Sequence, residues 1–210
     1  MGLRSLALIC LAVLTLAGCA TDKGYPDASP EQAAAAAYRH DGPPALTLYT
    51  MISNSSGSGA HTSLMINAPS QRVVFDPAGS VRLKAMPEVN DVLYGITPRI
   101  KDFYERAHAR NTYHVRIQRV EVAPDVAQRA LRLAQANGSV ASAMCSSSTS
   151  QILRQLPGFE GIKSTMFPNN LADQFAKIPG VSERILREED HDDKAVAIRE
   201  FEDKLAQEGQ

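Results

Sequence analysis

The feature that most restricts this chain is a cysteine at the start of a short helical pattern. Cys145 is followed by a run of Ser and Thr and then by apolar residues at the spacing of one helix face. The pattern stops at Leu156, before Pro157 and Gly158, which end helices. Cys145 therefore falls in or near the first helical turn, where free N–H groups and the helix dipole favour a thiolate. This position suits a cysteine nucleophile, and a small buried structural thiol is the alternative.

The first eighteen residues have the order of charge and hydropathy found in export signals. Arg4 is followed by an apolar run, Leu6 to Leu16, that is too short to remain as a membrane span. The next residues, Leu16-Ala17-Gly18-Cys19, resemble a bacterial lipobox. The resemblance implies cleavage before Cys19 and attachment of lipid to that residue. An ordinary secretory peptide with a chance cysteine is the alternative.

The expected processing leaves one thiol in the mature protein. Cys10 is removed with the signal peptide and Cys19 is acylated, so Cys145 has no cysteine to pair with in an oxidising compartment. An unpaired thiol there is either buried or used. Ala20 stands where an aspartate retains some lipoproteins at the inner membrane, so by resemblance we expect a location in the bacterial cell envelope, on the periplasmic face of the outer membrane.

Composition and the positions of Pro and Gly divide the chain into four parts. We expect a signal peptide over 1–18, a lipidated cysteine with a flexible Pro- and Gly-containing tether over 19–44, one domain over 45–187, and a charged C-terminal helix over 188–210. The formal net charge is −1, and Lys and Arg are scattered without interleaved aromatic residues. We therefore expect no nucleic-acid partner, and contact with the membrane only through lipid on Cys19.

The domain mixes strand and helix patterns, which predicts an α+β fold. Apolar runs at 45–52, 61–66 and 72–76, joined by a Ser/Gly loop and a Pro turn, predict an antiparallel meander. Further patterns predict helices that start near Pro98, Pro124, Cys145 and Pro168, and strands over 112–122 and 181–186.

A nucleophilic cysteine needs a base and a group that orients that base. His61 opens a strand directly after a glycine-rich loop, so we prefer it as base over His114, which lies within a regular strand. Asp76 ends the strand that should pair with the strand of His61, and its carboxylate could orient the imidazole. The alternative is that Asp76-Pro77 simply starts a turn. The backbone N–H of Cys145 is the expected oxyanion donor.

Four segments together resemble a known superfamily. They are 59–66 around His61, 72–79 around Asp76, 145–153 and 168–172. They resemble the permuted branch of the NlpC-type, papain-like superfamily, which includes YaeF/YiiX-like amidases and lecithin retinol acyltransferase-like proteins. The resemblance implies a circularly permuted papain-like domain, an antiparallel sheet packed on helices, with Cys145 as nucleophile and His61 as base. Members often have a large apolar residue shortly after the cysteine, where this chain has a Ser/Thr run.

These observations predict an envelope thiol hydrolase. We expect a cysteine amidase, peptidase or acyltransferase that forms an acyl-enzyme from an amide, with a cell-wall peptide as first choice of substrate and a lipid ester as second. We expect no metal and no organic cofactor. The alternative is a non-catalytic envelope lipoprotein that uses the same fold for binding or assembly.

Overall fold

The architecture is α+β, with one antiparallel sheet between helices. The computed structural model describes residues 26–208, so the expected signal peptide, Cys10 and Cys19 lie outside the described residues. The seven strands follow the order β4-β5-β3-β2-β1-β6-β7 across the sheet. Their bounds are β1 Ala45–Ser53, β2 Gly59–Asn67, β3 Arg72–Phe75, β4 Glu88–Val89, β5 Val92–Leu93, β6 Tyr113–Glu121 and β7 Ser182–Leu186.

The meander expected from the sequence is confirmed. β1 pairs with β2, and β2 with β3, both antiparallel. Along its other edge, β1 pairs antiparallel with β6. β6 in turn pairs with β7, which forms one edge of the sheet. β4 and β5 were not predicted, because two residues are too few to show an alternating pattern.

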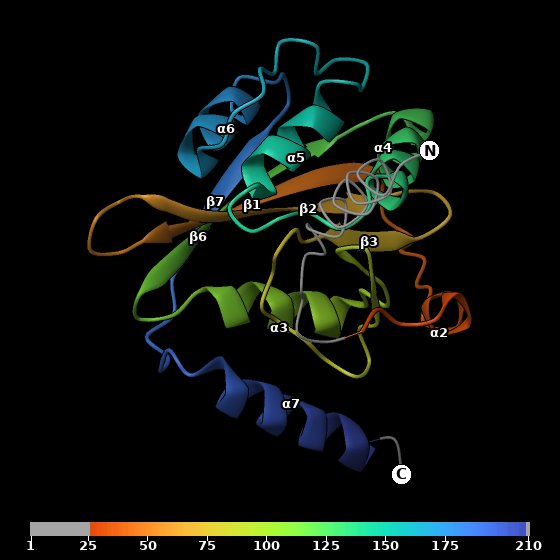
Figure 1. The fold of residues 1–210 in the computed structure, drawn as a ribbon, viewed down its shortest axis with the longest axis vertical. Coiled ribbons are helices and arrows are strands. Elements are labelled where there is room, and N and C mark those ends of the chain that lie inside the picture. The colour runs from red at the N-terminus through yellow and green to blue at the C-terminus, as the bar shows by residue number, and fades with distance from the viewer. Residues whose placement is uncertain (1–25, 209–210) are drawn as a thin grey trace, which may run out of the picture.

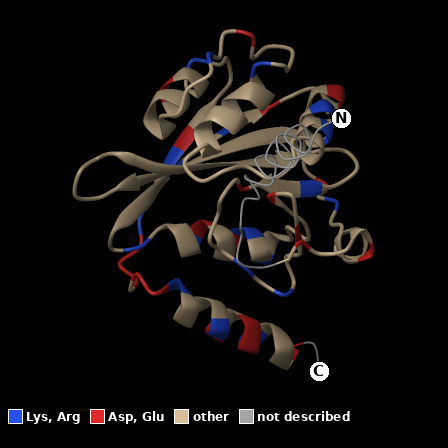
Figure 2. Ribbon diagram, viewed as in Figure 1, with Lys and Arg blue, Asp and Glu red and all other residues tan. Residues whose placement is uncertain are grey.

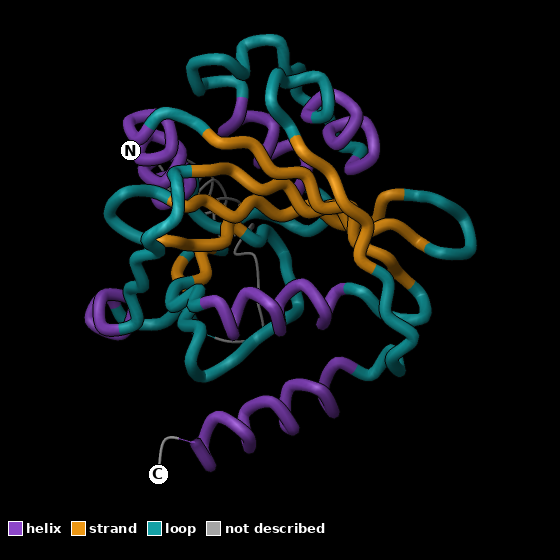
Figure 3. Tube along the Cα trace, turned by 180° about the vertical axis from the view of Figure 1, so that it is seen from behind, coloured by secondary structure: helices purple, strands orange, loops and turns teal. Residues whose placement is uncertain are grey.

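The helices lie on both sides of this sheet. Their bounds are α2 Pro30–Ala35, α3 Pro98–His108, α4 Pro124–Ala136, α5 Cys145–Leu153, α6 Pro168–Phe175 and α7 Lys194–Glu208. α4, α5 and α6 cover one face, α3 covers the other, and α7 lies outside α3 (Figures 1 and 3). Pro at the first helical position, as predicted, opens α3, α4 and α6.

Both faces of the central strands are buried, which explains their nearly continuous apolar sequences. In β1, Leu46 and Leu48 pack in the core beneath α4, α5 and α6. The alternate residues Tyr49 and Met51 pack in a second core with α3. Side chains of successive strand residues point to opposite faces, so one strand serves both cores.

The described part of the expected tether lies against the domain. Ser29 caps α2 through a capping box: its hydroxyl accepts from the N–H of Gln32, and the Gln32 side chain accepts from the N–H of Ser29. Ala33 packs in the core. The N–H of Arg72 donates to the carbonyl of Tyr38 (2.7 Å), and the amide of Asn67 donates to the carbonyl of Pro43 (2.8 Å). The described part of the tether, residues 26–44, is therefore docked on the domain and is not a free linker. Its Pro and Gly content alone does not distinguish the two.

The C-terminal helix α7 lies on the surface, as expected. None of its residues is buried, yet the ring of Phe201 stacks on Phe103 of α3 with centroids 4.2 Å apart. Charged residues are concentrated on α7 and the segment before it, whereas the loop between β1 and β2 carries none (Figure 2). No helix within residues 26–208 is long and apolar enough to cross a membrane.

Candidate active site

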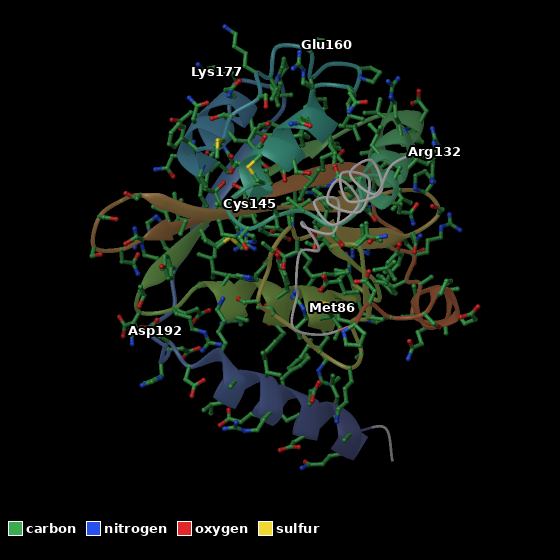
Figure 4. All side chains as sticks on the ribbon, viewed as in Figure 1. Met86, Arg132, Cys145, Glu160, Lys177 and Asp192 are labelled. Atoms are coloured by element: carbon green, nitrogen blue, oxygen red, sulfur yellow. The ribbon has the colours of Figure 1, made fainter. Side chains whose placement is uncertain are left out.

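Cys145 is the first residue of α5, as the helical pattern predicted. The helix is preceded by Ala143 in a left-handed conformation (φ 64°) and by Met144, which makes no side-chain cap. The first helical hydrogen bond runs from the N–H of Ser148 to the carbonyl of Met144 (2.9 Å). The earlier N–H groups of the turn, including that of Cys145, are therefore not used inside the helix. Cys145 is 6% exposed and lies beside the sheet (Figure 4).

His61 lies near the start of β2, where the sheet narrows. It is paired with Met51 of β1, just before an irregularity in the ladder. On its other side β3 ends at Phe75, which pairs with Leu64, so no β3 residue flanks the imidazole. This end of β2 is therefore open to side chains from other elements.

Glycine at position 59 allows α6 to approach the start of β2. A Cβ there would lie 2.7 Å from the Pro168 side chain and 2.7 Å from Oδ1 of Asn169. The Asn169 amide also donates to the carbonyl of Gly57 (2.8 Å). α6 thus holds the glycine-rich loop that leads into His61.

Asp76 is brought directly to His61. Its Oδ1 lies 2.7 Å from Nε2 of the imidazole, and the carboxylate is fully buried. The turn after β3 folds around it: the N–H of Gly79 donates to the carbonyl of Asp76 (3.0 Å). A Cβ on Gly79 would lie 1.9 Å from Oδ2 of Asp76, so only glycine fits. Asp76 therefore both starts a turn and contacts the imidazole, so the two roles considered from the sequence are compatible.

The imidazole and the Cys145 side chain also shift each other's pKa values. Burial disfavours the charged imidazole, but the hydrogen bonds and charges of Asp76 and Cys145 outweigh it and raise the pKa of His61 to about 9. Burial likewise disfavours a thiolate, but His61 and the Thr62 N–H lower the pKa of Cys145 below its usual range. For Asp76, His61 similarly outweighs burial and lowers the carboxyl pKa. An imidazolium–thiolate pair is thereby favoured near neutral pH.

His108 is part of this cluster and was not singled out from the sequence. Its ring stacks on His61 with centroids 6.3 Å apart and planes at 21°. Its Nδ1 hydrogen-bonds the carbonyl of Tyr104 (2.8 Å), and burial lowers the pKa of His108 to about 3. A neutral ring therefore packs against the charged one. The available signal was its spacing, four residues after Tyr104 on the apolar face of α3.

His114, the alternative base, and Tyr49 lie outside this cluster. His114 is on the outer part of β6, where Nδ1 contacts Oδ1 of Asn54 (2.6 Å). Tyr49 is fully buried in the α3-side core and donates to Glu105 (2.8 Å). In the described range 26–208, no group of three or more His, Cys, Asp or Glu side chains is arranged to hold a metal ion.

A cavity of about 250 Å³ opens beside the imidazole. Its lining includes His61, Ser80 and His108, together with Lys194 from the start of α7. Nζ of Lys194 donates to Oγ of Ser80 (3.0 Å). The lining does not include Cys145, so the cavity opens on the imidazole side of the pair. The C-terminal segment thus contributes a cation to the site.

The polarised pair predicts an unusually reactive thiol. We expect Cys145 to be alkylated by iodoacetamide with an apparent pKa below that of a free cysteine, about 8.5. His61→Gln should raise that pKa and slow alkylation at pH 7 on the order of tenfold, because a thiolate without its imidazolium is less populated. The measurement is the initial rate from pH 5 to 10, with His114→Gln as the matched control. A rate equal to that of unfolded protein and unchanged in His61→Gln would contradict the pairing.

The tight turn around Asp76 yields a second prediction. Gly79→Ala should displace the Asp76 carboxylate, lower the pKa of His61 and thereby raise the apparent pKa of Cys145 in the same alkylation assay. Gly161→Ala is the control, since nothing lies within 4 Å of a Cβ at that position. Equal alkylation profiles for the two variants would show that Asp76 does not tune the pair.

Comparisons of the chain with protein-family models, with curated proteins and with solved structures found no match. Any chemistry assigned to this site therefore rests on its own geometry.

Proposed function

We propose that this protein is a cell-envelope cysteine hydrolase, an amidase of the permuted papain-like (NlpC-type) class. The observation that carries the proposal is the imidazole of His61, which is hydrogen-bonded to the buried Asp76 carboxylate and lowers the pKa of Cys145 at a helix N-terminus. Nucleophile, base and orienting group are the three parts that such a reaction needs.

The reaction would proceed through an acyl-enzyme. The Cys145 thiolate attacks an amide carbonyl carbon, forming a C–S bond while the carbonyl oxygen becomes an oxyanion. His61, which carries the proton, gives it to the amide nitrogen as the C–N bond breaks and the amine leaves. A water molecule then attacks the thioester, His61 takes its proton, and the carboxylic acid is released with the thiolate restored.

Backbone groups at the start of α5 would stabilise the oxyanion. The N–H of Cys145 is not used in the helix, and the positive end of the helix dipole lies at the same place. The backbone N–H of Thr62 also lowers the pKa of Cys145, so it favours the thiolate before attack.

Two features support the permuted papain-like assignment. The base precedes the nucleophile in the chain, His61 before Cys145, as in the permuted branch. The nucleophile begins a helix that packs against the strand of the base: the hydroxyls of Thr62 and Ser146 lie 2.9 Å apart. An antiparallel sheet with the helix on one face is compatible with that class.

The substrate we propose is a cell-wall peptide amide. The expected export places the enzyme beside peptidoglycan, whose peptides carry free carboxylates. Lys194 brings a positive charge to the cavity beside His61, which suits such a substrate. A lipid ester, the second choice, would gain nothing from that charge.

Purified peptidoglycan is the direct test of this function. We expect the protein to release peptide fragments that mass spectrometry identifies, and Cys145→Ala to lose roughly 10³-fold or more of the activity. Because His61 must be protonated to expel the amine, activity should fall as pH rises through about 9, the pKa of His61. On the acid side it should fall as the thiolate is protonated, below the usual pKa of a cysteine.

The control for this assay is His114→Gln, which changes a half-buried histidine outside the site. If wild type and Cys145→Ala release the same fragments at the same rate, the hydrolase proposal fails. The non-catalytic envelope lipoprotein would then be the better description.

We also propose that lipid on Cys19 anchors the protein, on the evidence of the sequence alone. Cells grown with labelled palmitate should label the wild-type protein and not Cys19→Ser. The Cys145→Ser variant is the matched control and should be labelled like wild type. Label retained in Cys19→Ser would contradict the anchor.

A further inference from the structure

A second, larger cavity lies on the α3 side of the sheet, away from the cysteine. It has a volume of about 380 Å³, within the range of small-molecule sites. Its floor is formed by directly paired strand residues: Asn67 faces Arg72, and Thr47 faces both Met65 and Arg119. Asn67 is six residues along β2 from His61, about 20 Å in an extended strand. The two sites are therefore separate.

Arg72 is the central feature of this cavity. Its side chain is almost fully buried, with 3% of the residue exposed. Nε donates to the carbonyl of Ile96 (2.6 Å), and the guanidinium lies over the Tyr38 ring, 5.0 Å from the centroid. Within residues 26–208, Nη2 has no hydrogen-bond partner and Arg72 forms no ion pair. A buried cation with an unused donor is costly unless an anion completes it.

Two further buried polar atoms in the same cavity lack a partner. They are Oγ1 of Thr47 and Oδ1 of Asn67, neither of which has a hydrogen bond to the described part of the chain. Thr47 is 2% exposed, so bulk water does not satisfy its hydroxyl. Native proteins leave few such atoms. Nη2 of Arg72 and the Thr47 hydroxyl are donors that an anion can satisfy, whereas Oδ1 of Asn67 is an acceptor and needs an N–H, an O–H or a water molecule.

The acidic residues at the cavity are already engaged. Glu105 accepts from Tyr49 and is paired with Lys101 (2.7 Å) and Arg184. Glu183 is paired with Arg116 (3.0 Å). The negative charge of Glu105 also acts on Arg72. Within residues 26–208, however, neither carboxylate forms an ion pair with the Arg72 guanidinium.

We propose that this cavity binds a small organic carboxylate. The planar carboxylate would accept from the guanidinium of Arg72 and from the Thr47 hydroxyl, a match of geometry as well as charge. An apolar body would rest on Met65 and Ile117, which line the same cavity. A carboxylate with an apolar body fits better than inorganic phosphate, which would leave Met65 and Ile117 uncovered.

Binding of hexanoate, measured by isothermal titration calorimetry on the purified chain at low salt, tests this proposal. We expect saturable binding with one site, at least tenfold tighter than that of the neutral hexanamide. An N-acetylated dipeptide with a free C-terminal carboxylate is the second probe. Tighter binding of the dipeptide would assign the carboxylate to a peptide end, and tighter binding of hexanoate to a fatty-acid-like ligand. Both results support the site.

The variants locate the binding. Thr47→Val should weaken hexanoate binding severalfold and raise the melting temperature of the free protein, since an unsatisfied buried hydroxyl is removed. Arg119→Gln should also weaken binding. Arg132→Gln, an exposed cation on α4, is the matched control (Figure 4) and should bind like wild type. Arg72→Gln should abolish binding. If the Arg72→Gln protein does not fold, Thr47→Val and Arg119→Gln provide the test.

The proposal does not depend on the function of Cys145, so Cys145→Ser should bind hexanoate with wild-type affinity. Three results would overturn it: no saturable binding of either carboxylate, phosphate binding tighter than both, or equal affinity of Thr47→Val and wild type.

Discussion

The site depends on the imidazole of His61, which joins groups from opposite sides of the sheet. α5 carries Cys145 on one face, whereas the ring of His61 stacks on His108 from α3 on the other. Such a contact is possible only where a strand is missing. β3 stops at Phe75, and Asp76 then turns away from the ladder and points its carboxylate at His61. A β3 two residues longer would place backbone where the carboxylate of Asp76 now reaches the imidazole.

The same arrangement explains why the helix after the cysteine is rich in hydroxyl groups. Ser146 contacts the hydroxyl of Thr62, Ser148 donates to Asn137 (3.1 Å), and Ser150 accepts from the N–H of Thr165 (3.2 Å). Buried hydroxyls with partners fix the rotation of the helix more strictly than apolar contacts do, because each bond has a direction. The Ser/Thr run thus helps to orient Cys145.

The sequence predicts most of this fold where local rules act alone. Pro98, Pro124 and Pro168 mark helix starts, and the apolar run from Ala45 predicts the central strand. The proximity of Asp76 to His61 follows from the length of one turn. His108 and Lys194 were missed because their place in the site comes from packing of α3 and α7, which no local pattern encodes. The docking of residues 26–44 was missed for the same reason. The permuted papain-like assignment stays a prediction.

The two sites are linked by a continuous row of buried aromatic rings. From Glu105 the row passes through Tyr49, whose ring lies 5.6 Å from that of Tyr104, and then to His108 at 4.5 Å. Continuity of contact does not by itself transmit a signal, because coupling requires an element with two arrangements. Tyr49 and Tyr104 are at most 1% exposed, and each hydroxyl has a hydrogen-bond partner, to Glu105 and to Ser63 (2.7 Å). Rings held this way have one arrangement, so the row acts as a rigid wall. The carboxylate cavity and the cysteine site should therefore behave independently.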